Sequence, residues 1–170
     1  MPNKYLFKCA VCSSGNLQQI IDLPSLPLTG LYFPNSQLAK DSAKYDQGLN
    51  QCPVCGHAQL RVAIEPTEVY DDTYTHRTTG SSISKNGNDY LYKYINQNYE
   101  INNQTKYLEV GCNDGYLLKK FSKDTNSAYG LDPIWIDKDP PKYEEFTIFG
   151  GFASDISNVL PPEFKPNLVV

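Results

Sequence analysis

The stretch KYLEVGCNDGYLL, residues 106–118, decides how the second half of this chain folds. It begins with a short apolar run, typical of a buried strand, that ends at Gly111. Leu117, Leu118 and Phe121 then recur at helical spacing, so the loop opens a helix. A strand, a glycine loop and a helix in this order predict free backbone N–H groups at the helix N-terminus, which suit an anionic group of a ligand.

The spacing of the glycines narrows the type of loop. Gly111, Asn113 and Gly115 form Gly-x-Asn-x-Gly, and Glu109 lies two residues before the first glycine. A dinucleotide fold prefers Gly-x-Gly-x-x-Gly, and this loop is one residue too short for that pattern. It resembles motif I of S-adenosylmethionine-dependent methyltransferases, with asparagine in the middle glycine position. That resemblance implies a loop at the methionine end of the cofactor. The alternative is an ordinary glycine turn between a strand and a helix.

Three further strands are predicted after this loop, over residues 127–131, 146–149 and 168–170. The first of them ends at Asp132, which precedes a proline. A carboxylate there lies at the carboxyl edge of a parallel sheet, where ligands of open α/β sheets bind, and its two oxygens can accept hydrogen bonds from both hydroxyls of a ribose. The alternative is an aspartate that caps a turn or helix before the proline.

Composition and charge limit the class of protein. A chain of 170 residues with 40% hydrophobic and 20% charged residues fits one globular domain or two small ones. No apolar run reaches the roughly 20 residues that cross a membrane, and the N-terminal residues lack the apolar core of a signal peptide. The net charge is −4, so no basic footprint for nucleic acid is present. We expect a cytoplasmic protein without membrane or nucleic-acid partners.

Four of the five cysteines form two Cys-x-x-Cys knuckles, Cys9–Cys12 and Cys52–Cys55. In a reducing compartment such a pattern indicates metal binding or catalysis. Two residues between cysteines let one turn supply two thiolates, and four thiolates complete a tetrahedral zinc site. Because no coordination position is left open, the zinc is expected to be structural. The alternatives are a redox pair or unligated core cysteines.

The residues around the knuckles refine this prediction. Gly56 permits a left-handed conformation that aims backbone N–H groups at the sulfurs. His57 is a substitute ligand if one cysteine is not used. Prolines between the knuckles argue against a long helix, and short strands are expected over 16–23 and 59–62. The fifth cysteine, Cys112, is expected to be a semi-buried thiol in the glycine loop.

The sequence predicts three regions: a zinc-binding domain over 1–65, a connecting region over 66–103, and an α/β region over 104–170. The connecting region contains a polar, aromatic stretch over 70–82, which either lines a polar pocket or is a solvated loop. An amphipathic helix is expected over 88–98.

The whole chain resembles the zinc-containing, S-adenosylmethionine-dependent sugar C-methyltransferases, which act on nucleotide-linked deoxysugars in polysaccharide or antibiotic pathways. The stretch NDGYLL over 113–118 is the most specific match, and CGHAQL over 55–60 is similar to the family's Cys-Gly-x-x-Gln-Leu signature. The resemblance implies an α+β zinc-binding domain followed by the N-terminal part of an α/β, Rossmann-like class I methyltransferase fold. The zinc ligands that it implies are Cys9, Cys12, Cys52 and Cys55.

The resemblance also implies residues for the cofactor and the chemistry. The S-adenosylmethionine-binding residues are expected to be Glu109, Gly111, Asn113, Gly115 and Asp132. Tyr74 matches the first aromatic residue of the family's polar loop, and His76 stands in place of the second, so both are candidate catalytic residues. The family's Glu-His pair follows its fourth strand. We therefore expect the main base beyond Val170, and we expect the 170-residue chain to be inactive by itself.

The predicted activity is methyl transfer from S-adenosylmethionine to a carbon of a nucleotide-linked keto-deoxysugar. A base would remove a proton next to the keto group, and the enolate would attack the methyl group. Two alternatives remain open. One is a methyltransferase for another substrate class, such as a small metabolite, a protein or, against the acidic pI, an RNA. The other is a non-catalytic zinc-ribbon interaction module with a degenerate Rossmann-like remnant.

Overall fold

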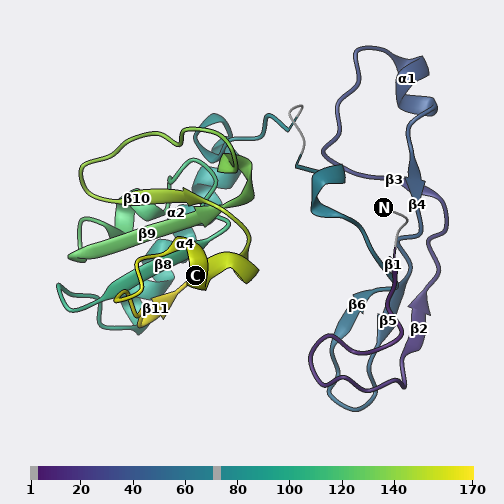
Figure 1. Ribbon diagram of the computed structural model, residues 1–170, viewed down its shortest axis with the longest axis horizontal. Coiled ribbons are helices and arrows are strands. Elements are labelled where there is room, and N and C mark those ends of the chain that lie inside the picture. Colours follow the sequence, from purple (N-terminus) through teal and green to yellow (C-terminus); the bar gives the residue numbers. More distant parts are fainter. Residues whose placement is uncertain (1–3, 71–73) are drawn as a thin grey trace. The chain divides into compact units, whose positions relative to one another are not determined.

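The computed structural model describes residues 4–70 and 74–170 of the chain. The chain divides into two compact units, with the boundary between Tyr74 and Thr75 (Figure 1). This boundary falls inside the connecting region that the sequence predicts over 66–103. Residues 71–73 of the predicted polar stretch lie outside the described residues.

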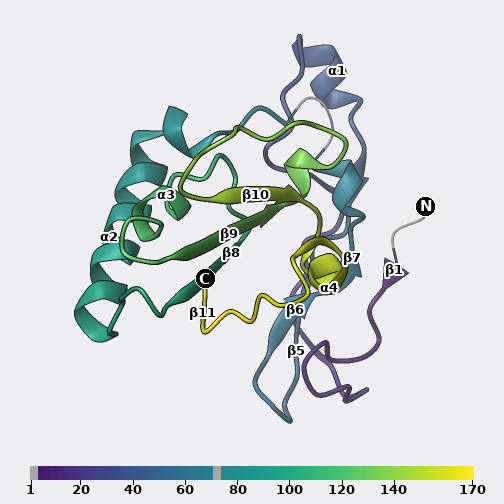
Figure 2. The same cartoon turned by 60° about the vertical axis from the view of Figure 1, so that its left-hand side comes forward.

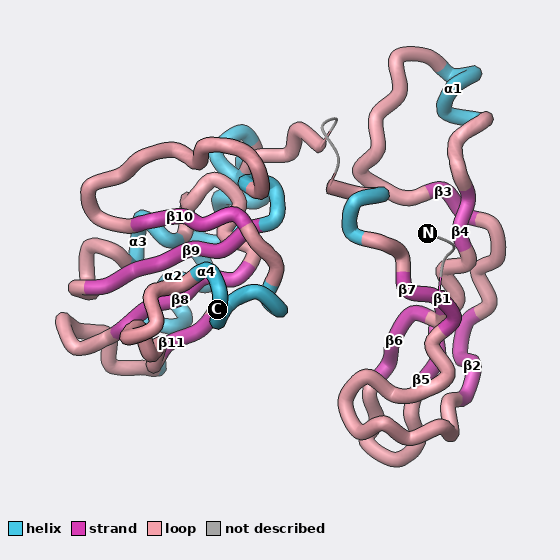
Figure 3. Tube along the Cα trace, viewed as in Figure 1, coloured by secondary structure: helices cyan, strands magenta, loops and turns pink. Residues whose placement is uncertain are grey.

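The first unit is built from short strands. Its elements are β1 Lys4–Tyr5, β2 Gln18–Ile21, β3 Leu26–Pro27, α1 Ser36–Lys40, β4 Lys44–Tyr45, β5 Leu49–Gln51, β6 Ala58–Leu60, β7 Val62–Ala63 and the 3-10 turn η1 Pro66–Glu68. All pairings are antiparallel: a sheet of order β2-β5-β6, and the pairs β1-β7 and β3-β4 (Figure 3). The strands predicted over 16–23 and 59–62 are confirmed, the second divided at Arg61. As the prolines predict, the only α-helix described in this unit has five residues.

Arg61 connects the strands of the first unit through its guanidinium group. It donates to both carboxylate oxygens of Asp46, at 2.9 and 2.7 Å, and to Asp22 at 2.7 Å. It also donates to the side-chain oxygen of Gln19 at 2.7 Å. These partners lie 15 to 42 residues away, and the planar fork of arginine matches two carboxylate oxygens at once. The side chain thus joins β2 and the turn before β5 to the β6–β7 connection.

The second unit contains a four-stranded parallel sheet. Its strands are β8 Lys106–Val110, β9 Ser127–Asp132, β10 Thr147–Gly150 and β11 Leu168–Val169. They lie in the order β10-β9-β8-β11 (Figure 1). In chain order this is 3-2-1-4, the order of the first four strands of a classic doubly wound sheet. All four predicted strands are confirmed; β10 is shifted by one residue, β9 ends one residue later than predicted, and β11 ends one residue earlier.

Helices cover both faces of this sheet (Figure 2). The helices α2 Ser82–Asn98 and α3 Leu118–Phe121 pack on one face, where Tyr107 and Phe121 are fully buried. The helix α4 Ile156–Val159 lies on the other face, beside a cluster around Leu108. Side chains of successive strand residues point to opposite faces, so the neighbours Tyr107 and Leu108 lie in the cores on the two different faces. Three further 3-10 turns are η2 Thr78–Gly80, η3 Pro133–Trp135 and η4 Ala153–Asp155.

The helices differ from their predicted lengths. The helix predicted over 88–98 begins six residues earlier, because the hydroxyl of Ser81 caps it by accepting from the N–H of Ser84 at 3.2 Å. The helix predicted from Leu117 has only one turn, α3. Among the described residues, none of the helices combines the length and the apolar character that a membrane span requires.

We predict that Arg61→Lys destabilises the first unit by about 1–3 kcal/mol, because lysine keeps the charge but cannot make the paired hydrogen bonds to Asp46. Amide hydrogen exchange of β5 and β6 measures the loss. The fluorescence of the single tryptophan, Trp135, follows the second unit and serves as an internal control. Unchanged exchange in β5 and β6 would contradict the prediction.

Candidate functional site

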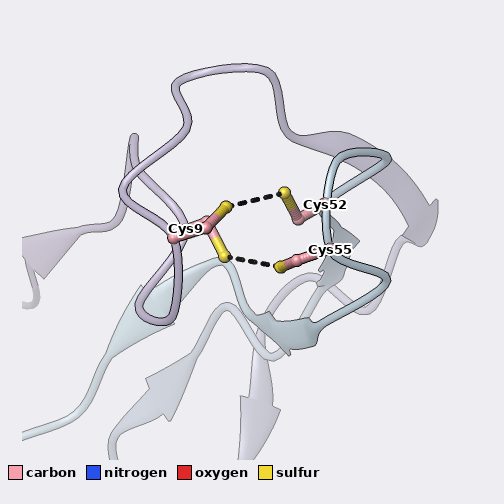
Figure 4. A group of neighbouring side chains, drawn as sticks. Cys9, Cys52 and Cys55 are labelled. Carbon is pink, nitrogen blue, oxygen red and sulfur yellow. Dashed lines mark hydrogen bonds between the residues drawn. The ribbon is translucent and has the colours of Figure 1, made fainter.

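The four knuckle cysteines converge in the first unit, and their sulfurs face one another (Figure 4). All four sulfur atoms lie within 4.8 Å of one another. The Sγ atoms of Cys9 and Cys55 are 3.6 Å apart, as are those of Cys12 and Cys52. A tetrahedral zinc ion with Zn–S bonds of about 2.3 Å holds its sulfurs about 3.8 Å apart. The four cysteines are therefore positioned to bind a zinc ion, and His57 is not part of this group.

Both knuckles form the same turn. The residue after the second cysteine of each knuckle has a positive φ, 61° at Ser13 and 78° at Gly56. In each knuckle its N–H donates to the carbonyl of the first cysteine: Ser13 to Cys9 at 2.9 Å, and Gly56 to Cys52 at 2.8 Å. The conformation predicted for Gly56 is confirmed, and the same shape at Ser13 shows that the turn itself, rather than the glycine, defines the knuckle.

The turns also favour the thiolate form of the first cysteine in each knuckle. The backbone N–H of Cys12 lowers the pKa of Cys9, and the backbone N–H of Cys55 lowers the pKa of Cys52. The thiolate is the form of cysteine that binds metal. The backbone therefore prepares two of the four ligands for a cation.

Gln59 joins the two knuckles, and sequence reasoning assigned it no role beyond the signature. Its buried side chain accepts from the N–H of Ala10 at 2.8 Å and donates to the carbonyl of Lys8 at 3.1 Å. These two residues flank Cys9, whereas Gln59 lies on β6 after the second knuckle. Its amide thus fixes the first pair of ligands against the second. The one sequence feature that could have indicated this role is the position of Gln59 in the Cys-Gly-x-x-Gln-Leu signature, four residues after Cys55.

We predict that Gln59→Leu lowers zinc affinity by about tenfold or more, because groups that orient metal ligands have effects of that size. Leucine retains the volume but neither hydrogen bond. Competition with a chromophoric chelator measures the affinity, and Gln18→Leu, an exposed glutamine on β2, is the matched control. Equal affinities in the two variants would refute the role of Gln59.

The glycine loop follows β8 in the second unit and takes three left-handed residues. The φ angles are 80° at Gly111, 51° at Asn113 and 78° at Gly115. A Cβ atom at Gly111 would meet open space, whereas one at Gly115 would contact Phe146 and Ile148 at 3.0 and 3.1 Å. Gly111 therefore leaves backbone accessible, and Gly115 allows the loop to pack on the core.

The N–H groups at the start of this loop are not free, whereas the expectation of free N–H groups at the helix N-terminus stays a prediction. The N–H groups of Gly111 and Cys112 are donated to the carbonyl of Leu131, at 2.7 and 3.3 Å. That of Asn113 is donated to the carboxylate of Asp132 at 2.7 Å. The start of the loop is bonded to the end of β9, so these three donors are not offered to an anion.

Three buried carboxyl groups lie in or beside the loop. Glu109, Asp114 and Asp132 are 7%, 8% and 6% exposed. Glu109 accepts from the hydroxyl of Tyr107 at 3.2 Å and from the backbone N–H of Leu118. The pKa of Glu109 is raised to about 8, chiefly by burial and also by the nearby charges of Asp132 and Asp114, against the lowering effect of these two hydrogen bonds. A cationic ligand group is favoured in such surroundings, and an anionic one is disfavoured.

The raised pKa of Glu109 predicts a pH-dependent stability. The folded chain keeps a proton that the unfolded chain releases above its ordinary pKa of 4.5. This contribution is fully present below about pH 4.5 and is lost as the pH rises through about 8. Trp135 fluorescence during chemical unfolding at each pH measures the free energy of the second unit.

Glu109→Gln is expected to remove most of this decline, because glutamine resembles the protonated acid at every pH. Glu145→Gln, the same change at an exposed position, is the control. A slope that persists in Glu109→Gln and matches that of the control would show that Glu109 is not the titrating group.

Asp132 caps a turn in addition to holding the loop. One carboxylate oxygen accepts from the N–H of Asn113. The other accepts from the N–H of Ile134, in η3, at 2.9 Å. The capping role that the sequence left as an alternative is thus present. The carboxylate also lies at the carboxyl end of β9, as predicted. Because each oxygen has two lone pairs, capping leaves acceptor capacity for a ligand.

The two candidate catalytic residues fall on different sides of the unit boundary. Tyr74 is the last residue of the first unit. Its ring packs edge-on against that of Tyr70, with the ring centroids 5.1 Å apart. His76 belongs to the second unit, and its backbone carbonyl accepts from the side chain of Asn113 at 3.3 Å. The polar stretch is therefore hydrogen-bonded to the glycine loop from residue 76 onward.

Cys112 is almost fully buried, whereas a semi-buried thiol was expected. Its sulfur occupies the space that the absent side chain of Gly130 leaves, since a Cβ there would lie 2.6 Å from it. Burial raises the pKa of Cys112, and the charges of Glu109 and Asp132 raise it further. The thiol packs the loop onto β9, and its raised pKa disfavours the thiolate that a nucleophile requires.

The comparisons with known proteins agree with the metal site. Residues 9–70 match the family model Methyltransf_13, described as a "Putative zinc binding domain". The match covers all four cysteines and Gln59. This part of the chain carries a methyltransferase-associated zinc-binding domain. A search of curated proteins finds no match to the chain.

Proposed function

We propose that the chain binds S-adenosylmethionine at the glycine loop and belongs to an enzyme that methylates a carbon of a nucleotide-linked keto-deoxysugar. The observation that carries the proposal is the pairing of a glycine loop whose first N–H groups are bonded internally with three buried carboxylates around it. S-adenosylmethionine brings a sulfonium and an ammonium group, both cationic. A dinucleotide brings a pyrophosphate, which needs free N–H donors.

The sheet topology supports the same place for the ligand. Ligands of open α/β sheets bind beyond the carboxyl ends of the strands, at the point where the strand order reverses. In the order β10-β9-β8-β11 this point lies between β8 and β11. The glycine loop directly follows β8 and therefore stands at the switch point of this parallel sheet.

The residues around the loop have distinct roles in this proposal. Gly111 lets the cofactor approach the backbone, because a Cβ there would point into open space. Asp132 accepts from the ribose hydroxyls with its remaining lone pairs. Glu109 lies beneath the loop and supplies negative charge when it ionises.

The methyl group comes from the bound S-adenosylmethionine, and the chain supplies binding and orientation for it. His76 is a candidate base for the proton that is removed next to the keto group, because its backbone is hydrogen-bonded to Asn113 of the loop. The zinc would be structural, since four thiolates leave no open position. The resemblance to sugar C-methyltransferases supports the substrate class, and the matched zinc-binding domain supports the association with a methyltransferase.

We predict that the chain binds S-adenosylhomocysteine and that Gly111→Ala weakens binding at least tenfold, because the methyl group would occupy the space of the ligand. Alanine at positive φ also costs about 1–2 kcal/mol of stability. Gly30→Ala is the matched control, since Gly30 has a φ of 88° and open space at its Cβ but lies in the first unit.

Titration calorimetry measures both affinities. Equal affinities for the two variants would show that the loop does not contact the cofactor, and binding of NAD in its place would overturn the proposal. Transfer of a labelled methyl group from S-adenosylmethionine to a nucleotide-linked keto-deoxysugar, against a nucleotide-linked sugar without the keto group, tests the substrate class.

A further inference from the structure

The geometry points to Asn113 and Asp114 as positioning residues that hold the segment 76–80 across the glycine loop, so that both form one cofactor site. This inference rests on the proposed function. It concerns the two residues at which the loop departs most from an ordinary glycine motif. Neither residue was expected to contact the segment 76–80 from the sequence.

Asn113 holds the segment at two points with one side chain. Its Oδ1 accepts from the N–H of Thr78 at 3.0 Å, and its Nδ2 donates to the carbonyl of His76 at 3.3 Å. Only a carboxamide offers a donor and an acceptor in this arrangement. Glycine, the usual residue at this place in the motif, could adopt the same φ but could not make either bond. The two bonds thus give the asparagine a specific purpose.

Asp114 holds the next residue of the segment. Its Oδ2 accepts from both the N–H and the Oγ1 of Thr79, at 2.9 and 2.5 Å. The side chain is buried, and its Oδ1 has no hydrogen-bond partner among the described residues. All hydrogen bonds of this carboxylate are therefore made by one oxygen, which faces the segment.

Asn113 is itself fixed by the residues after β9. Its N–H is donated to Asp132 at 2.7 Å, and its carbonyl accepts from the indole of Trp135 at 2.6 Å. A continuous chain of hydrogen bonds therefore runs from Asp132 through Asn113 to Thr78. A ligand that binds Asp132 is coupled to the segment through one residue.

The far end of the segment is fixed as well. The turn η2 spans Thr78–Gly80, and Ser81 then caps α2, which packs on the sheet through Ile95. The segment is thus held by the loop at one end and by a core helix at the other. We infer that it forms one wall of the cofactor site and keeps His76 beside the loop.

The decisive variant is Asn113→Gly. Glycine tolerates the φ of 51° without strain, so the loop and the fold are preserved while both bonds to the segment are lost. We expect amide exchange at Thr78 to become at least tenfold faster while amides of β8 and β9 keep their protection. Affinity for S-adenosylhomocysteine is expected to fall about tenfold, the size of effect for two hydrogen bonds.

A conservative pair at position 114 separates positioning from general structure. Asp114→Asn keeps an oxygen for Thr79 and places its amide nitrogen where Oδ1 has no partner, so it should keep Thr79 protected and the affinity within about threefold. Asp114→Ala should lose both the protection of the Thr79 amide and the affinity for S-adenosylhomocysteine. Loss in Asp114→Asn equal to that in Asp114→Ala would refute the positioning role.

The remaining outcomes distinguish the inference from the proposed function. Unchanged amide exchange at Thr78 in Asn113→Gly would refute the claim that Asn113 positions the segment 76–80. Faster exchange with unchanged affinity would show that the contact is structural only. If the wild-type chain failed to bind S-adenosylhomocysteine, the proposed function would be wrong and the role in cofactor binding would fall with it, while the exchange data would still report the contact itself.

Discussion

The carboxylate of Asp132 is the interaction on which the second unit depends most. It accepts the N–H of Asn113 from the loop after β8 and the N–H of Ile134 from the turn after β9. One buried side chain thereby ties together the carboxyl ends of two neighbouring strands. Because a buried carboxylate is costly without hydrogen bonds, the loop conformation and the burial of Asp132 depend on each other.

The first unit is held by a different kind of constraint. Its buried apolar side chains among the described residues are Cys9, Tyr45, Cys52 and Val62, and two of these are knuckle cysteines. So small a core cannot supply the free energy of folding alone, and metal binding contributes where the ligands are assembled. Arg61 and Gln59 complement the metal by joining segments that lie far apart in the chain.

Charge and backbone geometry together set what the glycine loop can hold. The first three N–H groups of the loop are bonded to the end of β9, and the buried carboxyl groups of Glu109, Asp114 and Asp132 lie in or beside the loop. A glycine loop after a strand is therefore not sufficient to identify a phosphate site. Whether its N–H groups are free or already bonded within the protein decides whether the loop favours an anionic or a cationic ligand group.

Local patterns allowed much of this protein to be predicted from its sequence. The spacing of Cys9, Cys12, Cys52 and Cys55 predicts the sulfur cluster, because a Cys-x-x-Cys turn presents both sulfurs on one side whatever surrounds it. The apolar runs predict all four parallel strands, since a buried strand needs only a short continuous apolar segment.

The tertiary structure alone decided the hydrogen-bond partners. The first three loop N–H groups are donated to the end of β9 about twenty residues later, and Asn113 and Asp114 bind a segment 35 residues earlier. Such partners depend on the register of β8 against β9 and on where α2 packs. No local pattern encodes these distances, so the sequence determined which groups could bond, and the fold determined to what.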